Sequence, residues 1–287
     1  MFDYGSEEDA LKDVLRLSQA MTYKSAVAGL PMGGGKAVIL GNPLKDKTHA
    51  LFRALGRFVE SLGGRYITAE DSGTTQADMA LIATETRHVT GTPRADGKRG
   101  DASEGTALGV FLSMQAARKE CSGSEDLKGV RVAIQGMGSI GTELTKLLSR
   151  AGAKLLVSDV HVPRVEEAAR LYGAEIVDPR EIYSVPADIF APCALGGVLN
   201  DDTIPRLQAK AVVGAANNQL LDSVHHSAML AKRGILYAPD YVVNAGGIIK
   251  LYLDMKAGTP EAGKVRVEQI ADTLRQSTND LIATSSR

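Results

Sequence analysis

The chain has 287 residues and a formal net charge of −1, from 33 lysines and arginines against 34 aspartates and glutamates. A balance this even gives no electrostatic basis for binding nucleic acid or an anionic membrane, and no stretch reaches the ~18 apolar residues of a membrane span. The length allows one large domain or two ordinary ones.

The N-terminus is acidic and lacks the basic-then-apolar layout of a secretory signal. The two cysteines, Cys121 and Cys193, have a spacing that fits no metal site, and Cys193 has no evident activating partner. The adjacent residues His225 and His226 are expected at the surface. We therefore expect a cytoplasmic protein with reduced thiols and no bound metal.

The N-terminal region predicts a helix followed by a glycine loop. Apolar residues near one face predict an amphipathic helix over residues 7–21, with Ser6 as its N-cap. Three consecutive glycines then stand at 33–35, between Lys24 and Lys36. Because glycines lack side chains, they let the backbone come close to a ligand. The sequence thus indicates a binding loop with a lysine on each side.

The two lysines suggest proton chemistry beside an anion. In a dry cleft, desolvation and a second positive charge favour the neutral form of Lys36, as a lysine base near neutral pH requires. Lys24, if it stays charged, can hold a substrate carboxylate. A strand predicted at 65–69 ends near Asp71, which can shuttle protons to a departing amine. The alternative is two solvated lysines and a turn-capping aspartate.

The remaining elements follow two different patterns. The first part also predicts a strand at 37–40 and helices at 48–62 and 76–87. A polar, glycine-rich stretch at 91–104 predicts a linker. After a helix predicted at 106–120, short apolar runs alternate with helical or loop segments, which indicates a parallel sheet covered by helices. The runs are 130–134, 154–157, 189–191, 211–213 and 235–237, and the tail at 261–287 is helical in pattern.

A glycine turn follows the first of these runs. Residues 136–141 read Gly-Met-Gly-Ser-Ile-Gly, directly before a predicted helix at 142–150. In a dinucleotide-binding turn, Gly136 would reverse the chain, Gly138 would admit the pyrophosphate and Gly141 would let helix and strand pack closely. The amides at the start of the helix would then face the phosphates.

An aspartate at the end of the next run supports this interpretation. Asp159 lies 23 residues after Gly136, where a carboxylate can accept both ribose hydroxyls and repel a 2′-phosphate. NAD is therefore favoured over NADP, although Arg164 is close in sequence. The alternative is a structural turn with an incidental aspartate. The expected fold is α/β with two domains, a substrate domain at residues 1–92 and a Rossmann-type, doubly wound cofactor domain at 93–287.

Six segments together resemble the amino acid dehydrogenase family, and within it the leucine dehydrogenases. They extend along nearly the whole chain. The resemblance implies oxidative deamination of an L-amino acid to its 2-oxo acid, with NAD reduced and ammonia released. The segments are MTYK at 21–24, GGGK at 33–36, YITAEDSGTT at 66–75, FAPCALGG at 190–197, NNQL at 217–220 and APDYVVNAGG at 238–247.

The resemblance also implies a role for each matching residue. Lys24 would hold the α-carboxylate of the substrate, and Asn244 would bind substrate beside it. Lys36 would activate water for attack on the imine, with Asp71 as the catalytic aspartate. The residues that would form the NAD site, including the last glycine of the turn, are Thr106, Gly136, Gly138, Gly141, Asp159, Ala194 and Asn217.

Three apolar residues match family positions that shape the side-chain pocket: Ile248 and Leu251, with Ala69 opposite. They suit a branched aliphatic side chain and offer no cation for a glutamate γ-carboxylate. Such a pocket discriminates by only ~1–3 kcal/mol per methylene, so leucine, valine and isoleucine are all expected as substrates. For Ile248 and Leu251, plain core packing is an equal alternative.

The resemblance begins late and stops early. Family members carry several tens of residues before the equivalent of Phe2 and further helices beyond that of Arg287. An incomplete gene model, a fragment or a genuinely short protein would each explain this, and the intact catalytic set favours the first two.

Two rival hypotheses are an NAD-binding fragment without turnover and a glutamate dehydrogenase relative. The family forms symmetric oligomers, so we expect a homo-oligomer.

Overall fold

The computed structural model describes residues 1–92 and 102–257. The helix predicted at 261–287 and most of the predicted linker lie outside these residues. Within them, every helix is too short or too polar to cross a bilayer.

Six strands form one parallel sheet in the order β3-β2-β1-β4-β5-β6. The order reverses between β1 and β4, so the sheet is doubly wound, as predicted, and this reversal is where such folds bind dinucleotides. The two-residue strand β3 was not predicted, because it is an exposed edge strand without an apolar run. The strands are β1 (Arg131–Gln135), β2 (Lys154–Ser158), β3 (Glu175–Ile176), β4 (Ile189–Pro192), β5 (Ala211–Val212) and β6 (Leu236–Tyr237).

The sheet is buried on both faces, which explains why its strands are continuous apolar runs. Alternate residues of β1 point to opposite sides. Val132 and Ile134 pack in a core that includes Met114 of one long helix, whereas Ala133 packs on the other side with Leu199 and its neighbours. The strands are therefore fixed in register by hydrophobic burial above and below.

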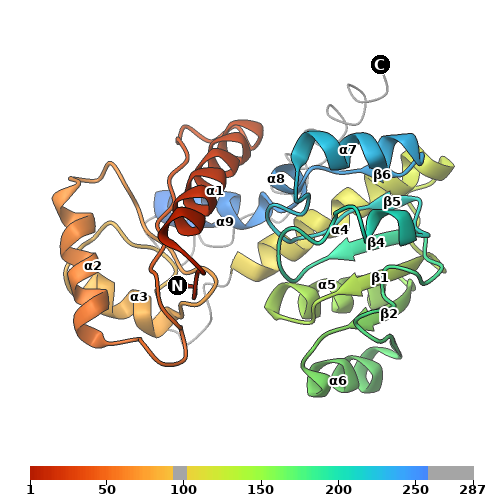
Figure 1. The fold of residues 1–287 in the computed structure, drawn as a ribbon, viewed down its shortest axis with the longest axis horizontal. Coiled ribbons are helices and arrows are strands. Elements are labelled where there is room, and N and C mark those ends of the chain that lie inside the picture. The colour runs from red at the N-terminus through yellow and green to blue at the C-terminus, as the bar shows by residue number, and fades with distance from the viewer. Residues whose placement is uncertain (93–101, 258–287) are drawn as a thin grey trace.

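Helices cover this sheet and continue into a second group of elements (Figure 1). The figure shows α2 and α3 on one side of the molecule, the sheet on the other, and α1, α8 and α9 between them. The helix α4 packs against α5 and α9, and α1 packs against α8. The helices are α1 (Glu7–Val27), α2 (His49–Ser61), α3 (Gln76–Ala83), α4 (Ala102–Ser122), α5 (Ser139–Arg150), α6 (Val162–Tyr172), η1 (Ile204–Arg206), α7 (Ser223–Lys232), α8 (Asp240–Val243) and α9 (Gly246–Ala257).

Side-chain caps determine where the N-terminal helices begin. Ser6 caps α1 by accepting the N–H of Asp9, as predicted, and Thr48 caps α2. Thr75 and Asp78 form a capping box at the start of α3. The helix α1 is longer than predicted and extends past Lys24, so this lysine is held by a helix rather than by a loop.

Two predicted strands of the N-terminal part are extended segments instead. The segment at 37–40 contributes a single bridge between Leu40 and Phe2, and the segment at 65–69 contributes one between Thr68 and Val89. Each finds one bridging partner among the described residues, which is too few for a ladder. The predicted linker at 91–104 also ends earlier than expected, because α4 begins at Ala102.

Candidate active site

The glycine turn lies at the carboxyl end of β1, beside the point where the strand order reverses. Gly136 has a φ of +99°, which disfavours any other residue, and a Cβ there would come within 2.8 Å of Ala194. A Cβ on Gly141 would overlap the carbonyl oxygen of Gly136, so helix and strand approach closely at this point. Gly138 faces open space, with nothing within 4 Å of an added Cβ. This arrangement fits a pyrophosphate against the start of α5.

Asp159 follows β2, and its carboxylate reaches back to the glycine turn. Its Oδ2 accepts the backbone N–H of Met137 at 2.6 Å, and its Oδ1 accepts that of His161 at 2.8 Å. Arg164 lies 3.9 Å from the same carboxylate. The acid therefore stands next to the glycine turn, where a ribose-binding group is expected, with an arginine beside it.

Two other residues predicted for the cofactor site follow strands at the same edge of the sheet, and a third lies in α4. Ala194 follows β4 and touches Gly136, and Asn217 follows β5. Thr106 lies in α4 next to Gly105, where α4 crosses α9 so closely that a Cβ on Gly105 would lie 2.8 Å from the Gly246 carbonyl oxygen. Because carboxyl ends of parallel strands share one edge, the segments that carry Ala194 and Asn217 converge there.

Lys36 and Asp71 are in direct contact, as an ion pair between the glycine loop and the turn before α3. The side chain of Lys36 is 18% exposed and that of Asp71 44%. The Asp71 turn is held by Thr74, whose hydroxyl accepts the Asp71 N–H at 3.0 Å and donates to the Asp71 carbonyl at 2.7 Å. The sequence hypothesis paired these two residues in one reaction, and the structure brings them together.

The glycine loop is shaped by its contact with α1. A Cβ on Gly34 would overlap the backbone of Thr22, whereas Gly33 faces open space. Lys24 is on the same helix and is only 7% exposed. Neither lysine is an ordinary solvated side chain, although Asp71 does cap its turn by accepting the N–H of Ser72 at 2.7 Å.

One side-chain oxygen of Asn217 accepts hydrogen bonds from both parts of the chain. Oδ1 of Asn217 accepts a hydrogen bond from Nζ of Lys24 at 3.3 Å and another from Nδ2 of Asn244 at 2.9 Å. Asn244 also donates to the carbonyl of Ala215 at 3.0 Å, and its own Oδ1 is a buried acceptor without a partner among the described residues. An acceptor in this position is available to a substrate N–H.

Burial lowers the pKa of both lysines. For Lys24 it lowers the pKa to about 8; the charge of Asp240 opposes this shift, and the charge of Lys36 adds to it. Burial is also the main cause of the lowered pKa of Lys36, while the charge of Asp13 raises it. The Asp71 contact favours the charged form of Lys36, so the proton on that amine is balanced between burial and ion pairing.

Replacing Lys24 with methionine is expected to remove a pH-dependent part of the stability. Unfolded lysine keeps its proton up to a pKa of 10.5, whereas folded Lys24 loses it near 8, a difference worth about 3 kcal/mol. Between these values unfolding takes up a proton, so wild-type stability should rise with pH relative to the variant. Denaturant unfolding near neutral pH and near pH 10.5 measures this; parallel pH profiles for the two proteins would contradict it.

The three predicted pocket residues are partly buried. Ile248 packs in an apolar cluster that includes Ala28 from the end of α1 and Phe111 of α4. Leu251 is half-buried one turn further along α9, and Ala69 is half-buried beside the Asp71 turn. Ile248 therefore lies against the helix that carries Lys24, on a surface of apolar side chains.

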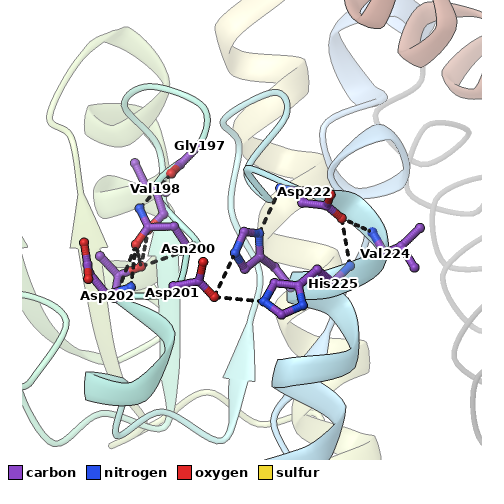
Figure 2. Close-up of polar contacts among 10 residues, drawn as sticks. Gly197, Val198, Asn200, Asp201, Asp202, Asp222, Val224 and His225 are labelled. Carbon is purple, nitrogen blue, oxygen red and sulfur yellow. Dashed lines mark hydrogen bonds and ion pairs between the residues drawn. The ribbon is translucent and has the colours of Figure 1, made fainter.

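A cluster of Asp201, His225 and His226 meets the spacing of metal ligands (Figure 2). Figure 2 shows the Asp201 carboxylate facing the His225 ring. Oδ1 of Asp201 lies 2.8 Å from Nε2 of His225. His226 is buried, contrary to the surface position expected from sequence, because its Nδ1 accepts the backbone N–H of Asp222 at 2.8 Å. That bond places the ring proton on Nε2, so this nitrogen has no lone pair for a metal. The contacts of this cluster instead stabilise the start of α7, where Asp222 is the N-cap.

Burial raises the pKa of the Cys193 thiol to about 12, so it is a packing residue rather than a nucleophile. The chemistry in this part of the molecule thus rests on amines, carboxylates and amides. A doubly wound sheet with a glycine turn at its switch point, and a buried lysine that bonds to Asn217 after β5, define a dinucleotide-dependent dehydrogenase as the class of protein.

Comparisons with known proteins agree with this class. The sequence model of the Glu/Leu/Phe/Val dehydrogenase dimerisation domain matches residues 4–88, and that of glutamate/leucine/phenylalanine/valine dehydrogenase matches residues 97–162 and 158–286. Leucine dehydrogenase of Thermoactinomyces intermedius is 52% identical over 274 residues, which is 96% of this chain and 75% of the relative. The chain belongs to this amino acid dehydrogenase family of oxidoreductases, and membership implies a nicotinamide cofactor.

Solved structures of similar proteins have the same fold. The crystal structure of L-tryptophan dehydrogenase from Nostoc punctiforme has a TM-score of 0.75 and 51% identity, and covers 95% of this chain and 77% of its own. Hetero-hexameric glutamate dehydrogenase from Thermus thermophilus in its Leu-bound form has a TM-score of 0.77 and 27% identity, covering 94% and 71%. The leucine dehydrogenase and the L-tryptophan dehydrogenase are thus almost equally identical to this chain, at 52% and 51%, although they are named for different substrates.

Proposed function

We propose that this protein catalyses the NAD-dependent oxidative deamination of a branched aliphatic L-amino acid to its 2-oxo acid and ammonia, and the reverse reductive amination. The observation that carries the proposal is the contact between Lys36 and Asp71, with a buried Lys24 close by. A nicotinamide cofactor would supply the hydride acceptor. The protein's own groups would supply the proton transfers and hold the substrate.

Each side chain has a task that its environment suits. Lys24 holds the α-carboxylate, since a buried ammonium without an ion pair among the described residues gains most from an anionic ligand. The buried Oδ1 of Asn244 accepts from the substrate amine. Lys36, whose pKa is lowered by burial, takes a proton from the water that attacks the imine carbon. Asp71, which contacts Lys36, can receive this proton from the lysine and pass it to the departing amine.

The cofactor choice rests on Asp159. Its carboxylate lies beside the glycine turn, where it favours ribose hydroxyls and repels a 2′-phosphate. Gly138, which faces open space, would admit the pyrophosphate at the start of α5, while Gly136 turns the chain and Gly141 lets α5 pack closely on β1. Thr106, Ala194 and Asn217 complete the site along the same edge of the sheet.

The substrate side chain is assigned to the apolar surface around Ile248. Leu251 and Ala69 complete the pocket, and these three apolar side chains themselves offer no cation for a γ-carboxylate. The proposed division is a substrate domain at residues 1–92 and a cofactor domain at 93–287. A homo-oligomer in the cytoplasm is the proposed state, in line with a matched domain described as a dimerisation domain.

The test is an absorbance assay for NADH with purified protein, NAD and single L-amino acids at alkaline pH. L-leucine is expected to give a higher kcat/KM than L-tryptophan or L-glutamate, and NADP to give a lower one than NAD. Faster turnover of L-glutamate would overturn the side-chain assignment. Calorimetric NAD binding without turnover of any amino acid would overturn the catalytic assignment and favour a binding protein.

A further inference from the structure

Two buried, opposite charges lie on helices that pack against each other. Lys24 is 7% exposed on α1, and Asp240 is 8% exposed at the start of α8. Each has a tyrosine as its chain neighbour, and the rings of Tyr23 and Tyr241 are in contact, with centroids 5.7 Å apart. The ring contact holds the two charged positions on facing elements.

Hydrogen bonds connect the two positions through one shared atom. Asp240 accepts the N–H of Asn244 at its backbone carbonyl, at 3.0 Å, which closes the single turn of α8. The side chain of Asn244 then donates to Oδ1 of Asn217, the same oxygen that accepts from Lys24. Asp240 is thus one helical turn from the residue that shares an acceptor with Lys24.

The Asp240 carboxylate does not form an ion pair with Lys24 within 4 Å in the described structure. Its Oδ1 accepts the N–H of Tyr241 at 2.7 Å. The Asp240 carboxylate and the Lys24 ammonium are both shielded from water. Their attraction, over a separation of more than 4 Å, is therefore screened far less than it would be at the surface. Asp240 therefore acts on Lys24 through the electrostatic field rather than through contact.

The charged groups that act on Lys24 come from two elements. Asp240 of α8 favours the ammonium form, whereas Lys36 of the glycine loop disfavours it, as does burial. The pKa of Tyr241 is raised by burial, so this neighbour stays neutral near pH 8. Among the described residues, Asp240 is then the charged group that opposes the neutralisation of Lys24 by burial and by Lys36.

We propose that Asp240 is a positioning residue that favours the charged form of Lys24 and so extends affinity for the substrate α-carboxylate to a higher pH than its burial alone would allow. The inference deepens the proposed function and rests on the role assigned there to Lys24. The proposed reaction needs a neutral Lys36 and a charged Lys24 at the same pH. Asp240 favours the charged form of Lys24 and so helps to meet this requirement.

The Asp240→Asn variant tests this, since the amide keeps the shape and can still accept the Tyr241 N–H. For each unit by which the variant lowers the pKa of Lys24, the charged fraction well above that pKa falls about tenfold. The KM for L-leucine, relative to wild type, is expected to rise about tenfold near pH 9 and little near pH 6.5, with kcat unchanged. A KM ratio that is the same at both pH values would overturn the proposal.

Two further variants separate this effect from general damage. Asp240→Glu restores the charge and should bring the KM ratio near pH 9 back towards one. Asp78→Asn removes an aspartate that is equally buried, at 8% exposure, but is paired with Lys47. This control should leave the pH profile of KM parallel to that of wild type, whatever its effect on stability.

Unfolding experiments give a readout that does not depend on turnover. In Asp240→Asn the rise of stability with pH should begin at a lower pH than in wild type, because Lys24 loses its proton earlier. In a Lys24→Met background this rise is expected to be absent, and the same substitution should then leave the pH dependence of stability above neutral pH unchanged. If no amino acid is turned over but this shift is present, the proposed function fails and the coupling stands; identical profiles would overturn the coupling itself.

Discussion

Replacing Lys36 with alanine is expected to lower kcat by about 10²–10⁴-fold, the contribution typical of a positioned general base, while NAD binding is retained. The amine contacts Asp71, and burial lowers its pKa, so it can accept a proton nearer neutral pH than a solvated lysine. The measurement is steady-state NADH formation from L-leucine, with NAD affinity from calorimetry. A Lys36→Ala variant with wild-type kcat would refute the assigned role.

A second lysine–aspartate pair provides a matched control. Nζ of Lys47 lies 2.5 Å from Oδ2 of Asp78, in the same part of the chain, and that aspartate belongs to the capping box of α3. Lys47→Ala should lower stability and leave kcat unchanged. If both variants lost kcat, the loss would reflect damage to the fold when either ion pair is removed. Lys36 would then have no demonstrated catalytic role.

The pH dependence of kcat gives an independent check on the same residue. A base must be unprotonated to act, so kcat should rise as the pH increases through the pKa of Lys36, which burial places below the ordinary lysine value of 10.5. Asp71→Asn removes the charge that favours the ammonium form, and this rise should then move to lower pH. A rise that stays in place would show that another group controls it.

The cofactor half could be predicted from sequence because its signals are local. The strand β1 runs directly into the glycine turn, and Asp159 ends the next strand, so motif and element are adjacent in the chain. The apolar runs were visible because both faces of the sheet are buried. β3 escaped prediction for the opposite reason, since two exposed edge residues leave no pattern.

The junction around Lys24 could not be predicted in the same way. Lys24 and Asn217 are 193 residues apart and meet through one hydrogen bond, and no periodicity records such a contact. Sequence reasoning placed Asn217 with the cofactor and did not single out Asp240, although both stand in segments that carried the resemblance. The burial of His226 was also missed, because it depends on a bond to the backbone of Asp222 that only the folded turn creates.

Replacing Gly141 with alanine is expected to abolish NAD binding and to destabilise the fold by about 2–4 kcal/mol. The added Cβ would overlap the carbonyl oxygen of Gly136, which belongs to the backbone and cannot rotate away. The helix α5 would have to move off β1, and with it the amides that are to face the pyrophosphate. Urea unfolding and titration of NADH fluorescence measure the two effects.

Gly138→Ala is the partner experiment, because it separates binding from folding at the same turn. Gly138 has a φ of −71°, which any residue adopts, and nothing lies within 4 Å of an added Cβ. Stability should therefore change by no more than about 1 kcal/mol. NADH affinity should still fall, because the methyl group would occupy the space proposed for the pyrophosphate. Wild-type affinity in Gly138→Ala would place the dinucleotide elsewhere, whereas wild-type stability in Gly141→Ala would contradict the close packing of α5 on β1.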